Sequence, residues 1–492
     1  GLDRLKAWKK YMAALTIGLG LLCSASALPG QGIAWAVRED AAESTAENAA
    51  ESAAAQTEGE KQNSDSAEKP RQDAQGRPIL GDGESGILIE AKSGTVLYES
   101  DSQKRVYPAS TTKIMTGLLA VEAMESGEIS ADTEVEVTAE MLEGLDPDSS
   151  NMELKAGEII SFENLLKGLM IPSGNDAAMA IAYRLSGTPE AFVERMNARA
   201  AALHMDNTHF ANAHGLHDDN HYTTAADMAK LSREAMQHEG FRDVVDIAHV
   251  KMAPTNKTEK QRYYINTNGL LSAMRYREYV YQGATGIKTG HTSQAGNCLV
   301  GSAVRGSMEL IAAVFGGKEI ADSHQDTKRM LDYGFSAFEL IVPIQKGEMM
   351  GEVKVKRAKS RDRVTLSVRE PVTVVVPKGT KAEELEIRLN LPEAVYAPVS
   401  KGQNIGSVTV LNQGQELGSG QLYSDLDVRR SFFWPAMALG EWLWSFWAVR
   451  VLCYLLIGIF CVLLVVAVCR IRREIKRQRR IRRQRRIRGE RK

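Results

Sequence analysis

The sequence of 492 residues contains only five cysteines, and their positions exclude a disulfide-stabilised fold. Cys23 lies in an apolar segment near the N-terminus, while Cys453, Cys461 and Cys469 lie in a second apolar segment near the C-terminus. Cys298 is therefore the only cysteine in the rest of the chain. Neither an intramolecular disulfide nor a zinc site made of cysteine pairs can form there, so packing must hold this part together.

The chain also has little net charge, because 61 Lys and Arg residues are balanced by 62 Asp and Glu residues. The formal value of −1 hides strong segregation of charge. Basic residues dominate 470–492, which directly follows an uninterrupted apolar run over 451–469. That run is long enough to cross a hydrocarbon core of about 30 Å. We predict a single transmembrane helix over 451–469, with a basic tail, 470–492, that stays in the cytoplasm and does not bind nucleic acid.

The first 36 residues have the order of a secretory signal peptide. Basic residues precede an apolar run over 12–22, and small-residue cleavage sites follow it. An uncleaved anchor is the alternative, but the apolar run is short for a bilayer span. We predict export by residues 1–36, with the chain before the transmembrane helix outside the cell membrane. An aromatic interfacial segment is predicted over 431–450 from its tryptophans, which are Trp434, Trp442, Trp444 and Trp447.

Aromatic residues are absent from 37–81, which is rich in Ala, Glu, Ser and Gln. This composition predicts a disordered spacer over 37–82. Two apolar runs within 86–98 then surround a Lys-Ser-Gly turn and predict a β-hairpin. Helical spacing of apolar residues follows, and two strand patterns return after it. The predicted helices are 114–124, 162–170, 176–185, 189–203, 225–237 and 330–335, and the strands are 298–304 and 309–315.

Two folded domains follow from these patterns. Strand patterns at both ends of 83–340 enclose the helices, which predicts a mixed α/β (α+β) domain. Apolar residues then alternate with polar residues, with turn residues at short intervals, over 345–428. This pattern predicts a small all-β, sandwich-like domain. It contains no group of residues that suggests catalysis, so a spacer or docking role is predicted for it.

Three short motifs in the mixed domain carry side chains suited to nucleophilic catalysis: Ser110-Thr111-Thr112-Lys113, Ser173-Gly174-Asn175 and Lys288-Thr289-Gly290. The first motif is weak alone, because Ser66-Ala67-Glu68-Lys69 in the spacer matches it by chance. Ser110 is predicted in the first turn of a helix, with Lys113 on the same face. A neutral lysine can take the serine proton, and burial and a nearby cation such as Lys288 would lower its pKa.

The other two motifs supply groups that could hold a substrate. Ser173 can relay a proton to a leaving amine and Asn175 can bind a peptide backbone, although an ordinary helix N-cap is the alternative. Lys288-Thr289-Gly290 is predicted to open a strand. Gly290 leaves room for an extended peptide to add along the strand edge. Lys288 and Thr289 would then offer a cation and a hydroxyl to the carboxylate of that peptide.

The three motifs in this order resemble the signature of penicillin-binding proteins and class A β-lactamases. Residues 107–116, 173–175 and 286–292 are similar to the low-molecular-weight serine-type D-alanyl-D-alanine carboxypeptidases. The resemblance implies a penicillin-binding/β-lactamase-like catalytic domain, a C-terminal β domain and a membrane anchor. It implies that Ser110 attacks between the two D-alanines of peptidoglycan stem pentapeptides, and that β-lactams acylate it. The oxyanion would lie between the backbone amides of Ser110 and His291. No cofactor and no metal are expected.

Three alternatives are less favoured. His214, His217, His221, Asp218 and Asp219 could ligate zinc in a metallopeptidase, but the His-Glu-x-x-His spacing is missing. A β-lactamase needs a deacylating base, usually in Glu-x-x-Leu-Asn, which is absent between the second and third motifs. A catalytically silent wall-binding scaffold would not need the intact motifs.

The sequence also departs from the family it resembles. Members often place arginines near the cleft, whereas Thr267, Ser323 and His324 occupy those neighbourhoods here. Binding of the substrate carboxylate by arginine is therefore not carried over from the resemblance.

Overall fold

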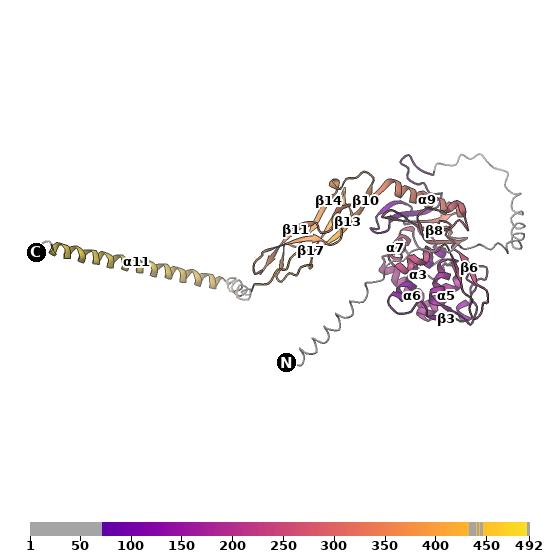
Figure 1. Ribbon diagram of the computed structural model, residues 1–492, viewed down its shortest axis with the longest axis horizontal. Helices are drawn as coiled ribbons and strands as arrows, with labels where there is room; N and C mark the ends of the chain where they lie inside the picture. The colour runs from indigo at the N-terminus through magenta and orange to yellow at the C-terminus, as the bar shows by residue number, and fades with distance from the viewer. Residues whose placement is uncertain (1–70, 432–438, 440–441, 443–445, 490–492) are drawn as a thin grey trace, which may run out of the picture. The chain divides into compact units, whose positions relative to one another are not determined.

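The computed structural model describes residues 71–431, 439, 442 and 446–489 (Figure 1). The predicted signal peptide, the spacer up to residue 70 and most of the interfacial segment lie outside the described residues. The last part of the predicted spacer is described and makes contacts. Gln72 forms a bridge with Pro78, and Arg71 forms ion pairs with Asp322 and Asp326 at 3.5 and 3.4 Å. These two acids lie on α9 (Ile320–Ala337).

An antiparallel sheet with the order β2-β1-β9-β8-β7 forms the centre of the first domain. The predicted hairpin is present, and its first strand also pairs with β9, which joins the two ends of the domain. Both predicted later strands are present as β8 and β9. The strands are β1 (Ser85–Glu90), β2 (Val96–Ser100), β7 (Ala284–Thr292), β8 (Gly296–Arg305) and β9 (Met308–Gly317).

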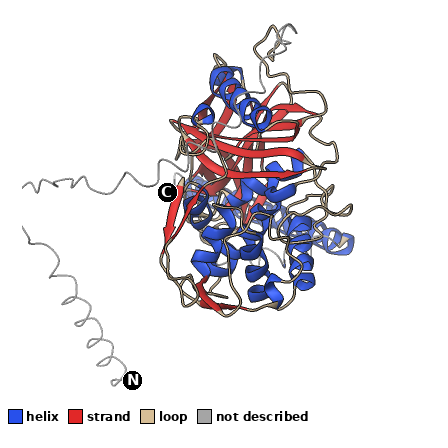
Figure 2. Cartoon of the chain, turned by 90° about the vertical axis from the view of Figure 1, so that its right-hand side faces the viewer, coloured by secondary structure: helices blue, strands red, loops and turns tan. Residues whose placement is uncertain are grey.

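Helices cover both faces of this sheet (Figure 2). Alternate residues of each strand enter different cores, as the period of two in a strand requires. Leu88 and Leu310 share a core with Leu331 of α9. Ile89 and Ile311 enter the larger core on the opposite face. The helices of that core include α3 (Lys113–Glu125), α7 (Ala225–Ala235) and α8 (Glu239–Val245).

Three more helices complete the larger lobe: α4 (Phe162–Met170), α5 (Asn175–Ser186) and α6 (Pro189–Ala202). Their bounds lie close to the predicted ones because apolar spacing and capping agree. The side chains of Ser161, Thr188 and Thr224 accept backbone hydrogen bonds at the starts of α4, α6 and α7. Short elements connect these helices: β3 (Glu134–Val137), β4 (Glu158–Ser161), β5 (His249–Met252), β6 (Arg262–Ile265), η3 (Glu140–Leu142) and η4 (Arg277–Tyr279).

Three local predictions need correction. Ser110 is not in the first turn of an α-helix but in a 3-10 turn, η2 (Ala109–Thr112), and α3 begins at Lys113. Lys288-Thr289-Gly290 lies inside β7 and does not open it. The predicted helix 330–335 is only the end of α9, whose first half buries polar side chains and so lacks the apolar signal; these are Ser323, His324, Asp326 and Thr327.

The second domain is all-β, as predicted. A six-stranded sheet has the order β14-β16-β17-β12-β11-β15, and β10 pairs with β13 separately. Alternating valines such as Val374, Val376 and Val408 fill its core. Its elements are β10 (Phe338–Ile344), β11 (Met349–Lys356), β12 (Arg363–Val368), β13 (Val372–Pro377), η5 (Ala382–Glu384), β14 (Glu386–Asn390), β15 (Ala394–Tyr396), β16 (Asn404–Asn412) and β17 (Gln415–Ser424).

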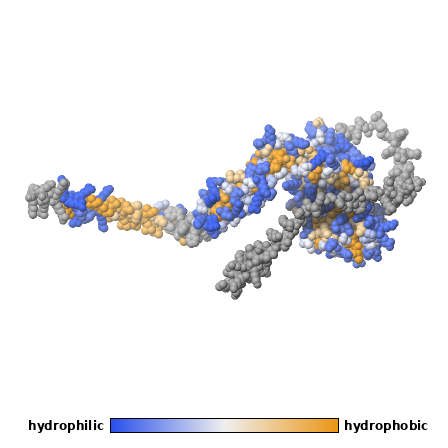
Figure 3. Space-filling view, in the orientation of Figure 1, coloured by the Kyte–Doolittle hydropathy of each residue, from blue (hydrophilic) through white to orange (hydrophobic). Residues whose placement is uncertain are grey.

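The chain ends in one long helix, α11 (Trp447–Gly489). Within the described residues it is the one helix whose length and composition suit a membrane span. Its apolar residues are exposed, and Figure 3 shows them as an apolar stretch followed by a hydrophilic one. The predicted order of a mixed domain, an all-β domain and a C-terminal apolar helix is therefore confirmed.

Candidate active site

Lys113 is the centre of the polar network beside Ser110. Its Nζ lies 3.0 Å from Ser110 Oγ and donates to Asn175 Oδ1 and to the backbone oxygen of His214, both at 2.7 Å. The side chain is fully buried. Burial, and then the charge of Lys288, hold the Lys113 pKa well below its usual value, while Asp176 opposes them.

The two donated hydrogen bonds fix the direction of the Lys113 lone pair. A neutral amine has only two hydrogens, and the oxygens of Asn175 and His214 accept both. In the neutral amine the lone pair is left for the third neighbour, the Ser110 hydroxyl 3.0 Å away, which can donate its proton to it. The predicted contact between Ser110 and Lys113 is therefore present, in a geometry that suits proton transfer.

Asn175 begins α5 and is oriented from a loop that the motifs do not include. Its Nδ2 donates to Ser149 Oγ at 3.0 Å. Its neighbour Asp176, also buried, accepts from the backbone nitrogens of Met152 and Leu154 at 2.9 and 3.0 Å. Asp176 thus holds the loop that carries Ser149 against the second motif. Sequence reasoning missed both residues, because no spacing rule links position 149 to position 175.

Ser173 has an unusual environment. It is 3% exposed, and its φ of 69° lies in the left-handed region that non-glycine residues rarely adopt. Its Oγ has no hydrogen-bond partner within the described part of the chain. Buried hydroxyls are nearly always paired, and strained residues gather at functional sites. The Ser173 hydroxyl is thus available to a bound group.

The third motif brings β7 beside the nucleophile. A methyl group at Gly290 would lie 2.8 Å from the Ser110 backbone nitrogen, so only glycine fits there. Lys288 Nζ donates to the Thr289 backbone oxygen at 3.1 Å, and Thr289 Oγ1 donates to Thr267 Oγ1 at 2.6 Å. Burial, with a contribution from Arg275, lowers the Lys288 pKa to about 7. Thr267 is thus part of this hydroxyl cluster.

His291 follows Gly290 on β7 and is exposed, opposite Asn297 on β8. The eight predicted site residues thus lie in three segments of the chain: 110–113, 173–175 and 288–291. The last of these segments is part of β7.

The histidines of the zinc alternative do not converge as metal ligands. His221 Nε2 lies 2.7 Å from Thr112 Oγ1, and its Nδ1 accepts from the Ala211 backbone nitrogen at 2.8 Å. Its Nε2 must therefore carry the hydrogen and donate it to Thr112. His214 Nδ1 accepts from the backbone nitrogen of Leu216 at 3.1 Å. The loop 211–221 instead supports the turn between Ser110 and Lys113.

We predict that His221 positions this turn through one hydrogen bond. In His221→Asn the amide oxygen can replace Nδ1 but nothing reaches Thr112, whereas in His221→Gln the amide nitrogen can still reach Thr112. We expect His221→Asn to lower kcat about 10- to 100-fold at unchanged KM, because a small displacement of a catalytic group has an effect of this size. We expect His221→Gln to retain most of the wild-type kcat. Steady-state kinetics on both variants measure this difference.

Thr112→Val removes the same hydrogen bond from its other end and serves as the control. Its effect and that of His221→Asn should not add in the double variant, because both remove one interaction. Equal losses in His221→Asn and His221→Gln would contradict this positioning role.

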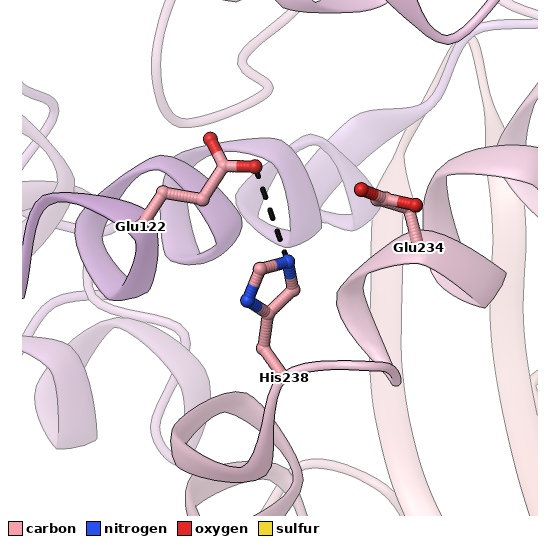
Figure 4. A group of neighbouring side chains, drawn as sticks. All are labelled: Glu122, Glu234 and His238. Atoms are coloured by element: carbon pink, nitrogen blue, oxygen red, sulfur yellow. Dashed lines mark ion pairs between the residues drawn. The ribbon is translucent and has the colours of Figure 1, made fainter. Parts of the chain in front are cut away.

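A second group of possible metal ligands is formed by Glu122, Glu234 and His238 (Figure 4). Arg199 Nη2 lies 2.6 Å from a carboxylate oxygen of each glutamate. The guanidinium already pairs with both acids, and His238 Nδ1 lies 2.7 Å from Glu125. We interpret this group as an ion-pair network that links α3, α6 and α7.

Two family models match the chain in succession. The model described as D-alanyl-D-alanine carboxypeptidase matches residues 74–319, and that described as the C-terminal domain of penicillin-binding protein 5 matches residues 338–430. D-alanyl-D-alanine carboxypeptidase DacF of Bacillus subtilis (strain 168) is 33% identical over 360 residues, 73% of this chain and 89% of the relative. The chain belongs to the D-alanyl-D-alanine carboxypeptidase family.

Further members of this D-alanyl-D-alanine carboxypeptidase family agree. DacA of Escherichia coli (strain K12) is 34% identical over 340 residues, 68% of this chain and 81% of the relative. A crystal structure of penicillin binding protein 5 from Haemophilus influenzae is 31% identical, has a TM-score of 0.60 and covers 70% of this chain and 97% of its own. The resemblance and the penicillin-binding fold are confirmed, and the chain is a low-molecular-weight penicillin-binding serine peptidase. These similarities do not support a β-lactamase or a silent scaffold.

Proposed function

We propose that this member of the D-alanyl-D-alanine carboxypeptidase family removes the C-terminal D-alanine from peptidoglycan stem pentapeptides through an acyl-enzyme on Ser110. The observation that carries the proposal is the buried Lys113 amine, which lies 3.0 Å from Ser110 Oγ and also contacts Asn175 and the His214 backbone oxygen. Ser110 Oγ attacks the carbonyl between the two D-alanines while its proton moves to Lys113. The oxyanion lies between the backbone amides of Ser110 and His291, and one such donor is typically worth about 100- to 1000-fold in rate.

The leaving amine needs a proton before the carbon–nitrogen bond can break. Ser173, whose hydroxyl is unpaired, relays the proton from Lys113 to the nitrogen of the departing D-alanine. The carbon–nitrogen bond breaks and leaves an ester on Ser110. A water molecule then attacks this ester while Lys113 takes the water proton. The bond between the acyl carbon and Ser110 Oγ breaks, and Lys113 returns the proton to Ser110 Oγ. Asn175 holds the peptide backbone during both steps. Lys288, Thr289 and Gly290 line the place of the terminal carboxylate.

Mass spectrometry of a stem pentapeptide tests the proposed reaction. We expect the peptide to lose one alanine with the wild-type protein and none with Ser110→Ala. Release of a larger fragment, or loss of alanine with Ser110→Ala, would contradict the proposal.

We predict that pH controls substrate binding through Lys288. Its pKa of about 7 lies far below the usual lysine value because the side chain is buried. Raising the pH above 7 removes the charge that faces the substrate carboxylate, so KM should rise up to about tenfold per pH unit. Arg275→Gln removes a repelling charge and should shift this rise to higher pH. Steady-state kinetics between pH 6 and 9 measure the change in KM. A KM of the wild type that does not change with pH would contradict the role of Lys288 in substrate binding.

We also propose the topology that the sequence predicts: residues 1–36 direct export, 451–469 cross the cell membrane once, and 470–492 remain in the cytoplasm. The apolar composition of α11 supports an anchor. The basic residues that follow it favour the cytoplasmic side. Protease added to intact spheroplasts should digest the catalytic domain and spare an epitope at the C-terminus. Digestion of the epitope with the catalytic domain spared would show that the orientation is the reverse of the proposed one.

A further inference from the structure

A group of basic side chains lies on one end of the β domain. On β11, Val353 and Val355 are buried while Lys354 and Lys356 are exposed, as the alternation of a strand requires. The loop that follows adds Lys359 and Arg361, both exposed. The acidic side chains nearby include Asp362 and Glu393, which are exposed, and Glu352, which lies 3.6 Å from Arg363.

A tyrosine completes this surface. Tyr396 lies on the edge strand β15, directly beside Lys356 of β11, and is 56% exposed. The Arg357 guanidinium lies 5.0 Å from the centre of its ring, and Lys356 Nζ lies 5.8 Å from it. An exposed tyrosine ring among cations suits the boundary between water and lipid, where the ring is apolar and the hydroxyl is hydrated. We call Lys354, Lys356, Arg357, Lys359, Arg361 and Tyr396 the basic surface.

Backbone hydrogen bonds attach the basic surface to the point where the chain leaves the domain. The Lys359 nitrogen donates to the Arg429 oxygen at 3.0 Å, and the Ser431 nitrogen donates to the Arg357 oxygen at 2.9 Å. Trp434 follows three residues after Ser431. The basic surface thus lies at the point where the chain leaves the β domain, three residues before Trp434 in the sequence.

We propose that the basic surface docks on anionic phospholipid headgroups of the membrane that α11 crosses. Charge complementarity identifies this partner, because basic residues beside a span are attracted to anionic lipid within a Debye length of about 8 Å at physiological ionic strength. The backbone hydrogen bonds to Arg429 and Ser431 keep the basic surface close to the point where the chain leaves the domain toward the membrane anchor. The proposal rests on the proposed membrane anchor and is independent of the roles given to the catalytic residues.

An environment-sensitive fluorophore on Ser360→Cys tests the docking, because Ser360 is exposed within the basic loop. The full chain, with alanine at Cys23, Cys453, Cys461 and Cys469, is placed in nanodiscs of phosphatidylcholine with or without about one-third phosphatidylglycerol. We expect a blue shift and about twofold brighter emission only with the anionic lipid, and reversal at about 0.5 M salt. A probe on Glu383→Cys, beside the strand where the chain enters the domain, should not respond.

Matched charge variants complete the experiment. Lys356→Gln, Lys359→Gln and Arg361→Gln together should abolish the response, whereas three exposed cations elsewhere on the domain should be dispensable. Those control substitutions are Lys378→Gln, Lys381→Gln and Arg388→Gln. Equal emission in both lipids, with the protein bound to the nanodiscs, would overturn the docking while leaving the anchor intact. An equal response to soluble polyphosphate in neutral nanodiscs would also overturn it. Failure to enter nanodiscs would overturn the anchor as well.

Discussion

Lys113→Met is expected to leave a folded protein that a penicillin acylates about a thousandfold more slowly. General-base catalysis is typically worth about 100- to 10,000-fold. Within the described residues, Lys113 is the one side chain that forms a hydrogen bond with Ser110 Oγ. Methionine has a similar volume and fills the buried site. Stopped-flow acylation with a fluorescent penicillin measures the rate, and thermal unfolding checks the fold.

The stability of this variant separates catalysis from structure. A lysine whose folded pKa is lowered costs folding free energy below its unfolded pKa, since the unfolded state binds the proton more tightly. Methionine removes this cost, although it leaves the oxygens of Asn175 and His214 without a donor. A large loss of acylation with little change in melting temperature is therefore expected. Acylation at the wild-type rate would mean that another group takes the Ser110 proton.

Gly215→Ala should disrupt the site from outside the three motifs. A methyl group there would lie 1.9 Å from the backbone oxygen of Ala109, the residue before the nucleophile, and the φ of 94° disfavours any side chain. The oxygen belongs to the backbone, so η2 itself must move. We expect a loss of about 3 kcal/mol or more in the free energy of unfolding, at the upper end for single substitutions, together with loss of acylation.

Gly187→Ala is the matched control. Gly187 ends α5 with a φ of 80° and has open space where the methyl group would lie. Gly187→Ala should lower the free energy of unfolding only by the conformational penalty of the positive φ, about 1 kcal/mol, and should leave acylation unchanged. Denaturant unfolding of both variants gives the two free energies. If both substitutions cost the same, the close contact between loop 211–221 and η2 does not support the nucleophile.

Local signals in the sequence predicted most of the helices and strands. The hydroxyl caps and apolar spacing of α4 and α6 lie within the helices themselves, so a single segment carries the information. The order of the three motifs likewise identified Ser110, Lys113 and Lys288. The start of α9 was missed because buried polar residues there are satisfied by distant partners, such as Arg71 on Asp326.

The supporting contacts of the site could not be predicted in the same way. Asp176 binds the backbone of Met152, and His221 binds Thr112 across more than 100 positions. Their side chains look like ordinary loop or ligand residues until the fold brings the partners together. His221 was thus considered as a metal ligand, whereas its two nitrogens are engaged by the chain itself. Such roles depend on contacts between residues far apart in the sequence. The spacing of apolar residues within one segment does not indicate these contacts.

In the proposed reaction Ser110 becomes covalently acylated. Incubation with a penicillin followed by digestion and peptide mass spectrometry tests it directly, because the family is penicillin-binding and the ester should be hydrolysed slowly. We predict a single adduct on Ser110, present in the wild type and in Ser66→Ala, and absent in Ser110→Ala. An adduct on Ser173 or any other residue, or an adduct that persists in Ser110→Ala, would contradict the account.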